Sequence, residues 1–234
     1  MSRTPASADA VPDLEALRAL PGTVLKDEGP KTARVVRYDL PDGPVVLKEW
    51  APPRGLLIRA WARFFQRREI NHYRALEGIE GIPRLRRVYG IHAFVLDFVD
   101  GEPLKRRLAE ADPERFARAL DDLERVVAAL HARRFCHLDL HQKLNALVTA
   151  EGRVWLIDLG QGLDFSRGWL RRPLFGVARR IDRNAVLKFR ARYAPGTLDP
   201  AVRDDVVARF GERKRRWYFD APRRLLRRLF VRGG

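Results

Sequence analysis

The chain contains the stretch CHLDLHQKLNALV at residues 136–148, followed after a short turn by VWLIDLG at residues 154–160. The apolar runs at 146–148 and 154–157, with a Glu-Gly turn between them, predict the two strands of a hairpin. Such a hairpin would bring Asp139, Asn145 and Asp158 to one end of the strand pair. Oxygen donors suit a hard cation such as Mg²⁺ that carries phosphates, although an ordinary hairpin with solvated acidic residues has the same pattern.

This order of residues resembles the catalytic loop and the metal loop of the protein-kinase-like superfamily. The resemblance implies that Asp139, two residues after His137, orients and deprotonates an acceptor hydroxyl, and that Asn145 and Asp158 bind Mg²⁺. The family has four residues between the Asp and the Asn, whereas this chain has five. We therefore expect the loop to bulge by one residue, with residue 142 or 143 toward solvent and Asn145 still near Asp158.

Short apolar segments upstream, at 23–25, 33–38 and 45–50, predict a meander of three strands. The resemblance implies that the first turn, which contains Gly29, covers the phosphates of ATP, although the family usually has several glycines there. It also implies that Lys48, the one lysine in an apolar strand, contacts the α- and β-phosphates. An edge-strand lysine on the solvent face would have the same pattern.

One helix, or two, is predicted over residues 56–76, because apolar residues recur there at helical spacing. The resemblance implies that Glu69 pairs with Lys48, and Glu77 is the alternative partner. Glu69 could instead pair with the neighbouring arginines on the surface. Two more strands are predicted at 88–89 and 93–96. The residues after them resemble the hinge of the family, where backbone groups of Asp97 and Val99 would hold adenine.

The second half of the chain is predicted to be mainly helical. Asp112 followed by Pro113 is typical of a helix start, and further helices are expected at 177–193 and from Asp199 to about 210. The two histidines at 131 and 137 are expected to have structural, hydrogen-bonding roles. The apolar residues that predict the buried face of the first of these helices are Phe116, Leu120, Leu123, Val127 and Leu130.

These elements predict an α+β protein with a two-lobed protein-kinase-like fold. The small lobe would have five strands and one main helix, and the large lobe would be shortened and mainly helical. We expect an N-terminal lead over residues 1–20, of which 1–13 are disordered. The small lobe is then predicted over residues 21–100. The large lobe, with a basic C-terminal tail, is predicted over residues 101–234.

Composition narrows the possible environment and partners. The chain has 234 residues, a formal net charge of +16 and one cysteine, so an intramolecular disulfide is excluded and a reducing compartment is favoured. The first 13 residues do not resemble a secretory signal and no apolar run is long enough to span a bilayer. These features predict a cytoplasmic protein. Peripheral attachment to the inner face of the membrane is compatible with them. The positive charge favours polyanions such as nucleic acid, anionic lipid or phosphorylated glycolipid.

The acceptor is suggested by resemblance alone. After Gly162 there is no Ala-Pro-Glu element and no long activation segment, and His141 stands where protein kinases usually have lysine. These features resemble bacterial lipopolysaccharide core kinases, which phosphorylate heptose or 3-deoxy-octulosonic acid, and imply ATP, Mg²⁺ and a lipid-linked sugar hydroxyl. The near competitor is a RIO-type serine/threonine protein kinase, for which a basic surface would suit a ribosomal target. A non-catalytic pseudokinase scaffold is the third reading.

Two segments combine arginines with bulky apolar residues, at 54–68 and 214–232. Basic amphipathic helices with aromatic residues are typical of interfacial binding, so we expect association with an anionic membrane surface. The first segment would have the same pattern if it packed on the sheet of the small lobe. Nucleic acid could use the same charge, with less gain from the apolar residues.

Overall fold

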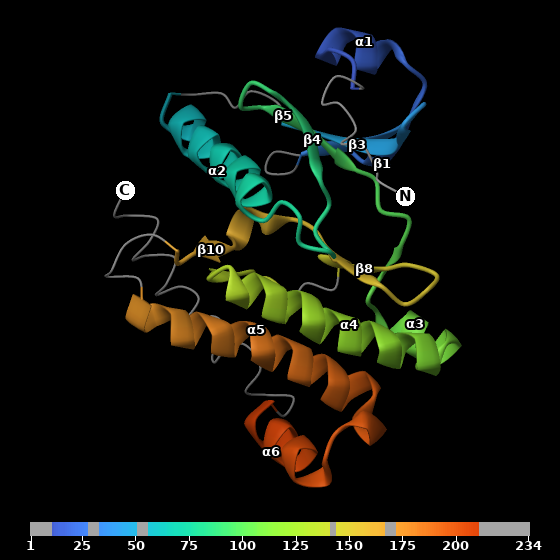
Figure 1. Cartoon of the computed structure of the whole chain (residues 1–234), viewed down its shortest axis with the longest axis vertical. Coiled ribbons are helices and arrows are strands. Elements are labelled where there is room, and N and C mark those ends of the chain that lie inside the picture. Colours follow the sequence, from blue (N-terminus) through green and yellow to red (C-terminus); the bar gives the residue numbers. More distant parts are fainter. Residues whose placement is uncertain (1–10, 28–32, 51–55, 141–143, 167–171, 211–234) are drawn as a thin grey trace, which may run out of the picture. The chain divides into compact units, whose positions relative to one another are not determined.

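The computed structural model describes residues 11–27, 33–50, 56–140, 144–166 and 172–210 (Figure 1). Its contacts divide the chain into two compact units. The first unit comprises residues 1–78 and 82–100, and the second comprises 79–81 and 101–234. No described helix is both long and apolar enough to cross a membrane.

The first unit is built on a five-stranded antiparallel sheet, as the sequence predicts. Alternate residues of the inner strands are buried, among them Val36, Tyr38, Val45 and Leu47, which is the period expected for a sheet with one covered face. The helix of this unit that matters for the site is α2 (Leu56–Ala75). The strands are β1 (Gly22–Lys26), β2 (Arg34–Leu40), β3 (Gly43–Glu49), β4 (Leu85–Tyr89) and β5 (Ala93–Asp97), in the order β1-β2-β3-β5-β4.

The short helix α1 (Leu14–Ala19) and the residues before it pack on this sheet. Asp13 caps the helix by accepting the N–H of Ala16 at 2.9 Å. Val11 is 1% exposed and belongs to the same apolar cluster as the inner strands. The prediction of disorder is therefore wrong for residues 11–13, because Val11 is buried and the carbonyls of Val11 and Pro12 accept hydrogen bonds from Arg87 and Tyr89 of β4. Residues 1–10 lie outside the described residues.

The second unit is organised around α4 (Pro113–Ala132) and α5 (Arg172–Tyr193), which pack together. Asp112 accepts the N–H of Arg115 at 2.9 Å and Pro113 opens the helix, as predicted. The predicted apolar face of α4 is buried, and each such side chain contributes about 1.5–3 kcal/mol. The remaining elements are α3 (Arg106–Ala111), α6 (Pro200–Phe210), the sheet of β6 (Glu102–Pro103), β8 (Ala146–Val148) and β9 (Val154–Leu156), and the pair β7 (Phe135–Cys136) and β10 (Leu163–Asp164).

Two details of the second unit depend on single residues. Helix α5 begins at 172 rather than at 177, because a proline in the first turn of a helix, here Pro173, loses no hydrogen bond. The carbonyl oxygen of Gly81 accepts the N–H of Leu156 at 2.8 Å, and Gly81 has a φ of +99°. A Cβ there would lie 2.5 Å from Val126 and 2.8 Å from the carbonyl oxygen of Val154, so glycine is required.

Candidate active site

The loop that carries Asp139 is closed by a hydrogen-bonded amide. The Nδ2 of Asn145 donates to the backbone oxygen of Asp139 and to its Oδ2, each at 3.2 Å. Both side chains are buried, with Asp139 4% and Asn145 6% exposed. Asn145 therefore stays against Asp139 despite the extra residue in the loop. The predicted solvent-facing residues 142 and 143, and His141, lie outside the described residues.

The hairpin after this loop places Asn145 and Asp158 at its same end. Strands β8 and β9 pair Ala146 with Leu156, and the N–H of Ile157 donates to the carbonyl of Asn145 at 2.9 Å. Asp158 follows directly and is exposed, with left-handed φ and ψ of 59° and 61°. It begins the 3₁₀ turn Leu159–Gln161. The predicted position of Asn145 and Asp158 at one end of the hairpin is therefore confirmed.

The donors at this end of the hairpin fit a hard cation. Asp158 offers an exposed carboxylate, and the Nδ2 of Asn145 is used for the bonds to Asp139. The amide oxygen of Asn145 makes no hydrogen bond to a described residue, so it can act as a ligand. Carboxylate and amide oxygens are what Mg²⁺ uses when it also binds phosphates. The roles of both residues as ligands stay predictions.

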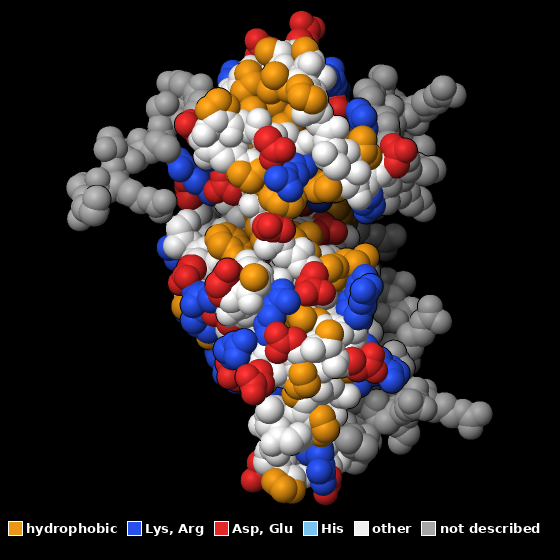
Figure 2. Space-filling model, turned by 90° about the vertical axis from the view of Figure 1, so that its right-hand side faces the viewer, with side chains coloured by type: hydrophobic (Ala, Val, Ile, Leu, Met, Phe, Trp, Pro, Cys, Tyr) orange, Lys and Arg blue, Asp and Glu red, His pale blue; other side chains and the backbone are white. Residues whose placement is uncertain are grey.

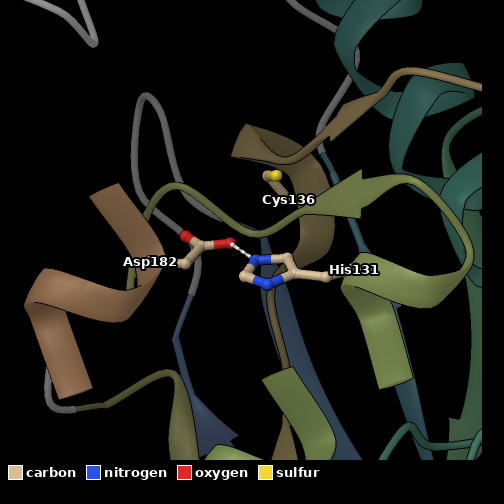
Figure 3. A group of neighbouring side chains, drawn as sticks. All are labelled: His131, Cys136 and Asp182. Carbon is tan, nitrogen blue, oxygen red and sulfur yellow. Dashed lines mark hydrogen bonds and ion pairs between the residues drawn. The ribbon is translucent and has the colours of Figure 1, made fainter. Parts of the chain in front are cut away.

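A buried carboxylate that was not predicted from the sequence accepts hydrogen bonds from the backbone of this loop. Asp182 of α5 is fully buried. Its Oδ2 accepts the N–H of His137 at 2.9 Å and its Oδ1 accepts the N–H of Leu138 at 2.8 Å. The Nε2 of His131 lies 3.2 Å from Oδ2 (Figure 3). Three donors from the end of α4 and from the loop therefore converge on one acid.

The sequence does carry a signal for Asp182. With Ala178, Ala185 and Phe189 it falls at spacings of three and four residues, and these neighbours are all buried. A carboxylate on the apolar face of a helix must find hydrogen-bond partners, since burying an unpaired charge is very costly.

The two histidines have the structural roles that we expected. His137 is fully buried, its Nδ1 accepts the N–H of Asp139 at 3.3 Å, and its Nε2 donates to the carbonyl of Ile157 at 3.2 Å. These two bonds fix the neutral tautomer with the proton on Nε2. His137 thereby connects the backbone beside Asp139 with the strand that ends at Asp158.

His131, Cys136 and Asp182 form a buried group whose potential ligand atoms lie within 4.8 Å of one another (Figure 3). The residue types could hold a metal, but both oxygens of Asp182 already accept backbone N–H groups. Burial, and then the Asp182 carboxylate, raise the pKa of the Cys136 thiol far above its ordinary value, against a smaller lowering by Arg179. The thiol is therefore neutral, and hydrogen bonding accounts for the arrangement.

In the first unit, Lys48 of β3 and Glu69 of α2 form an ion pair. The Lys48 Nζ lies 2.6 Å from the Glu69 Oε1, and the side chains are 18% and 5% exposed. The same Nζ lies 5.1 Å from the ring centre of Trp50, within cation–π range. Glu77, the alternative partner, is exposed and lies 4.0 Å from Arg84 instead. The expected pair is thus present, and its part in phosphate binding stays a prediction.

The remaining predicted nucleotide contacts lie at the end of β5. The side chain of Asp97 accepts a hydrogen bond from Arg86 at 3.1 Å, and its N–H donates to the carbonyl of Arg84 at 3.0 Å. Val99 is half-buried, and its backbone makes no hydrogen bond to the described residues. Val99 therefore offers backbone groups to a base more readily than Asp97 does. Gly29 lies outside the described residues.

Comparison with models of protein families places part of the chain in a known family. The family model for the RIO domain matches residues 56–189, which is more than half of the chain. The matched residues include Glu69, Asp139, Asn145 and Asp158, whereas Lys48 precedes them. No curated protein matches the chain.

Proposed function

The chain belongs to the RIO domain family, whose members are atypical, ATP-using kinase-like proteins, and from this premise we propose that it transfers the γ-phosphate of ATP to a hydroxyl group. The observation that supports this most is the arrangement at the end of the β8–β9 hairpin. Asp139 is held there by Asn145, with Asp158 at the same end, and all three fall within the matched residues. The acceptor that fits the family is a serine or threonine hydroxyl of a protein.

Each residue has a distinct part in this proposal. Asp139 orients the acceptor hydroxyl and takes its proton, with its carboxylate held by the Nδ2 of Asn145. Asp158 and Asn145 hold Mg²⁺, which when bound neutralises charge on the phosphates. Lys48, kept in place by Glu69, neutralises the α- and β-phosphates. Positioning and charge neutralisation supply most of the rate acceleration in phosphoryl transfer.

Asp182 and His137 support this chemistry without touching the substrate. The two N–H bonds to Asp182 fix the backbone on the N-terminal side of Asp139. His137 fixes the N–H of Asp139 itself. Because a catalytic group must lie within hydrogen-bond reach of the proton that it abstracts, a rigid loop base contributes directly to the rate.

The test is ATP turnover by the full chain with generic protein, with lipopolysaccharide core and with no acceptor. We expect phosphate on protein serine or threonine. Asp139→Asn and Asp158→Asn should each lower the rate by roughly 10²–10⁴-fold, the usual contribution of a general base or of charge stabilisation. Asp42→Asn removes an exposed turn carboxylate and should leave the rate unchanged. Wild-type rates in a folded Asp139 or Asp158 variant would refute the assignment.

A lipopolysaccharide core sugar is the second candidate acceptor, favoured by the arginines and aromatic residues at 214–232. This segment lies outside the described residues. Phosphate found on lipopolysaccharide and not on protein would support this candidate. Flotation with anionic vesicles, weakened by salt and by deletion of residues 214–234, would support attachment to a membrane face. Nucleotide binding without turnover on any acceptor would favour the pseudokinase scaffold.

A further inference from the structure

Helix α5 has an unbalanced charge. It carries six arginines and one lysine but a single carboxylate, Asp182. That carboxylate is fully buried and is used by the backbone of the loop at 137–138. The outer side of α5 therefore has no acidic residue of its own.

Several arginines elsewhere in the second unit are paired with nearby acids. On α4 and the hairpin these pairs are Arg115–Glu102, Arg118–Glu114, Arg125–Asp122 and Arg153–Glu80. Acidic and basic side chains alternate on the face drawn in Figure 2. Even on α5, Arg190 pairs with Asp121 and Glu124 of α4. In these pairs an acid of the same unit compensates the guanidinium.

The N-terminal half of α5 is different. Arg180 and Arg183 are exposed, and neither forms an ion pair or hydrogen bond with a described residue. Arg134 and Arg179 place their guanidinium groups 5.8 Å and 5.6 Å from the ring centre of Phe175. We call Arg179, Arg180 and Arg183 of α5, together with Arg134, which directly precedes β7, the α5 basic face. Its like charges repel one another until an external anion compensates them.

We propose that the α5 basic face binds the phosphate backbone of a nucleic acid. Guanidinium groups donate two parallel N–H bonds to a phosphate, which makes arginine the favoured residue for this contact. A helix that lies in a membrane interface would add bulky apolar side chains to the cations. Of the large apolar residues described on α5, Val177 is the one that is exposed, at 44%. The chemistry of the face therefore fits a phosphate polymer better than a lipid surface.

The experiment measures binding of the full chain to a fluorescein-labelled single-stranded 20-nucleotide RNA by anisotropy, without ATP and over a range of salt. We expect affinity to fall as salt rises, because each neutralised phosphate releases counterions. Arg180→Glu/Arg183→Glu should weaken binding by about tenfold or more, and should reduce the slope of log K against log salt by roughly 1.4, or 0.7 per lost single-strand contact. Arg180→Gln/Arg183→Gln should have a smaller effect in the same direction.

The matched control is Arg106→Glu/Arg118→Glu, which makes the same change of net charge at exposed arginines of α3 and α4 that have local acidic partners. It should weaken binding by less than the α5 variant. An equal loss in both would mean that net charge alone attracts RNA, and an unchanged α5 variant would mean that another segment binds it. Either result overturns the proposal. So would vesicle binding that is lost in the α5 variant while RNA binding is kept. ATP turnover is measured separately, so failure here and failure of the proposed function are distinguishable.

Discussion

The Asp182 contacts in the second unit and the Lys48–Glu69 pair in the first both involve a buried carboxylate, but they differ in what the carboxylate holds. Asp182 is fully buried and accepts two backbone N–H groups, so it fixes the main chain. Glu69 contacts the end of a long, flexible side chain that is 18% exposed. The first arrangement can be lost only by moving the loop, whereas the second can be lost by a rotamer change.

This difference separates a structural requirement from an adjustable contact. A buried N–H group that loses its acceptor costs about 1–3 kcal/mol. The Lys48–Glu69 pair contributes less, because the long Lys48 side chain can turn its ammonium toward solvent when the contact is lost. We therefore expect changes at Asp182 to lower stability as well as the rate, and changes at Glu69 to act mainly on activity.

The largest effect is expected for Asp182→Ala. This change leaves the N–H groups of His137 and Leu138 buried without an acceptor, so the free energy of unfolding should fall by roughly 3–5 kcal/mol. Urea unfolding followed by circular dichroism measures it. Asp182→Asn keeps one side-chain oxygen and should lose less. If the alanine variant were as stable as wild type, the loop would not depend on this carboxylate.

A smaller loss of stability is expected for Gly81→Ala, which tests packing rather than hydrogen bonding. Gly81→Ala places a Cβ 2.5 Å from Val126 at a φ of +99°, so it should cost about 2–4 kcal/mol in unfolding free energy. Gly90→Ala is the matched control, because Gly90 has a φ of +62° with no atom within 4 Å of the added Cβ. It should cost only about 1 kcal/mol, the backbone penalty alone. Equal losses in the two variants would show that the contact with α4 is not tight.

The smallest effect on stability is expected for Glu69→Gln. Breaking the pair with Lys48 should lower the free energy of unfolding by about 1 kcal/mol, while phosphotransfer falls much further. A double-mutant cycle with Lys48→Met isolates the coupling between the two side chains. A stability loss as large as that of Asp182→Ala would remove the distinction between the two regions. An unchanged rate of phosphate transfer in Glu69→Gln would contradict the role proposed for the Lys48–Glu69 pair.

The parts of the molecule that depend on local pattern could be predicted from the sequence. The strand meander, α4 with its Asp112 cap, and the hairpin that places Asn145 and Asp158 together all follow from periodicity and turn residues. The pairing of Lys48 with Glu69 followed from family resemblance. Asp182 was missed although it lies on the apolar face of α5, because the backbone groups that it binds lie 44 and 45 residues away. The order at Val11 was missed for the same reason, since its contacts are with distant strands.

Three residues near Asp139 in the sequence have left-handed backbone conformations, which limits the substitutions that they tolerate. The described non-glycine residues with positive φ are Arg134, Leu138 and Asp158, at 55°, 62° and 59°. A left-handed residue with a side chain costs about 1–2 kcal/mol, so glycine at each position would relieve local strain. Glycine would also remove the buried leucine side chain, or the carboxylate expected to hold the metal, or a cation of the α5 basic face. At Asp158, relief of strain by glycine and retention of the expected metal ligand are therefore opposed, whereas at Leu138 the lost burial itself offsets the relief.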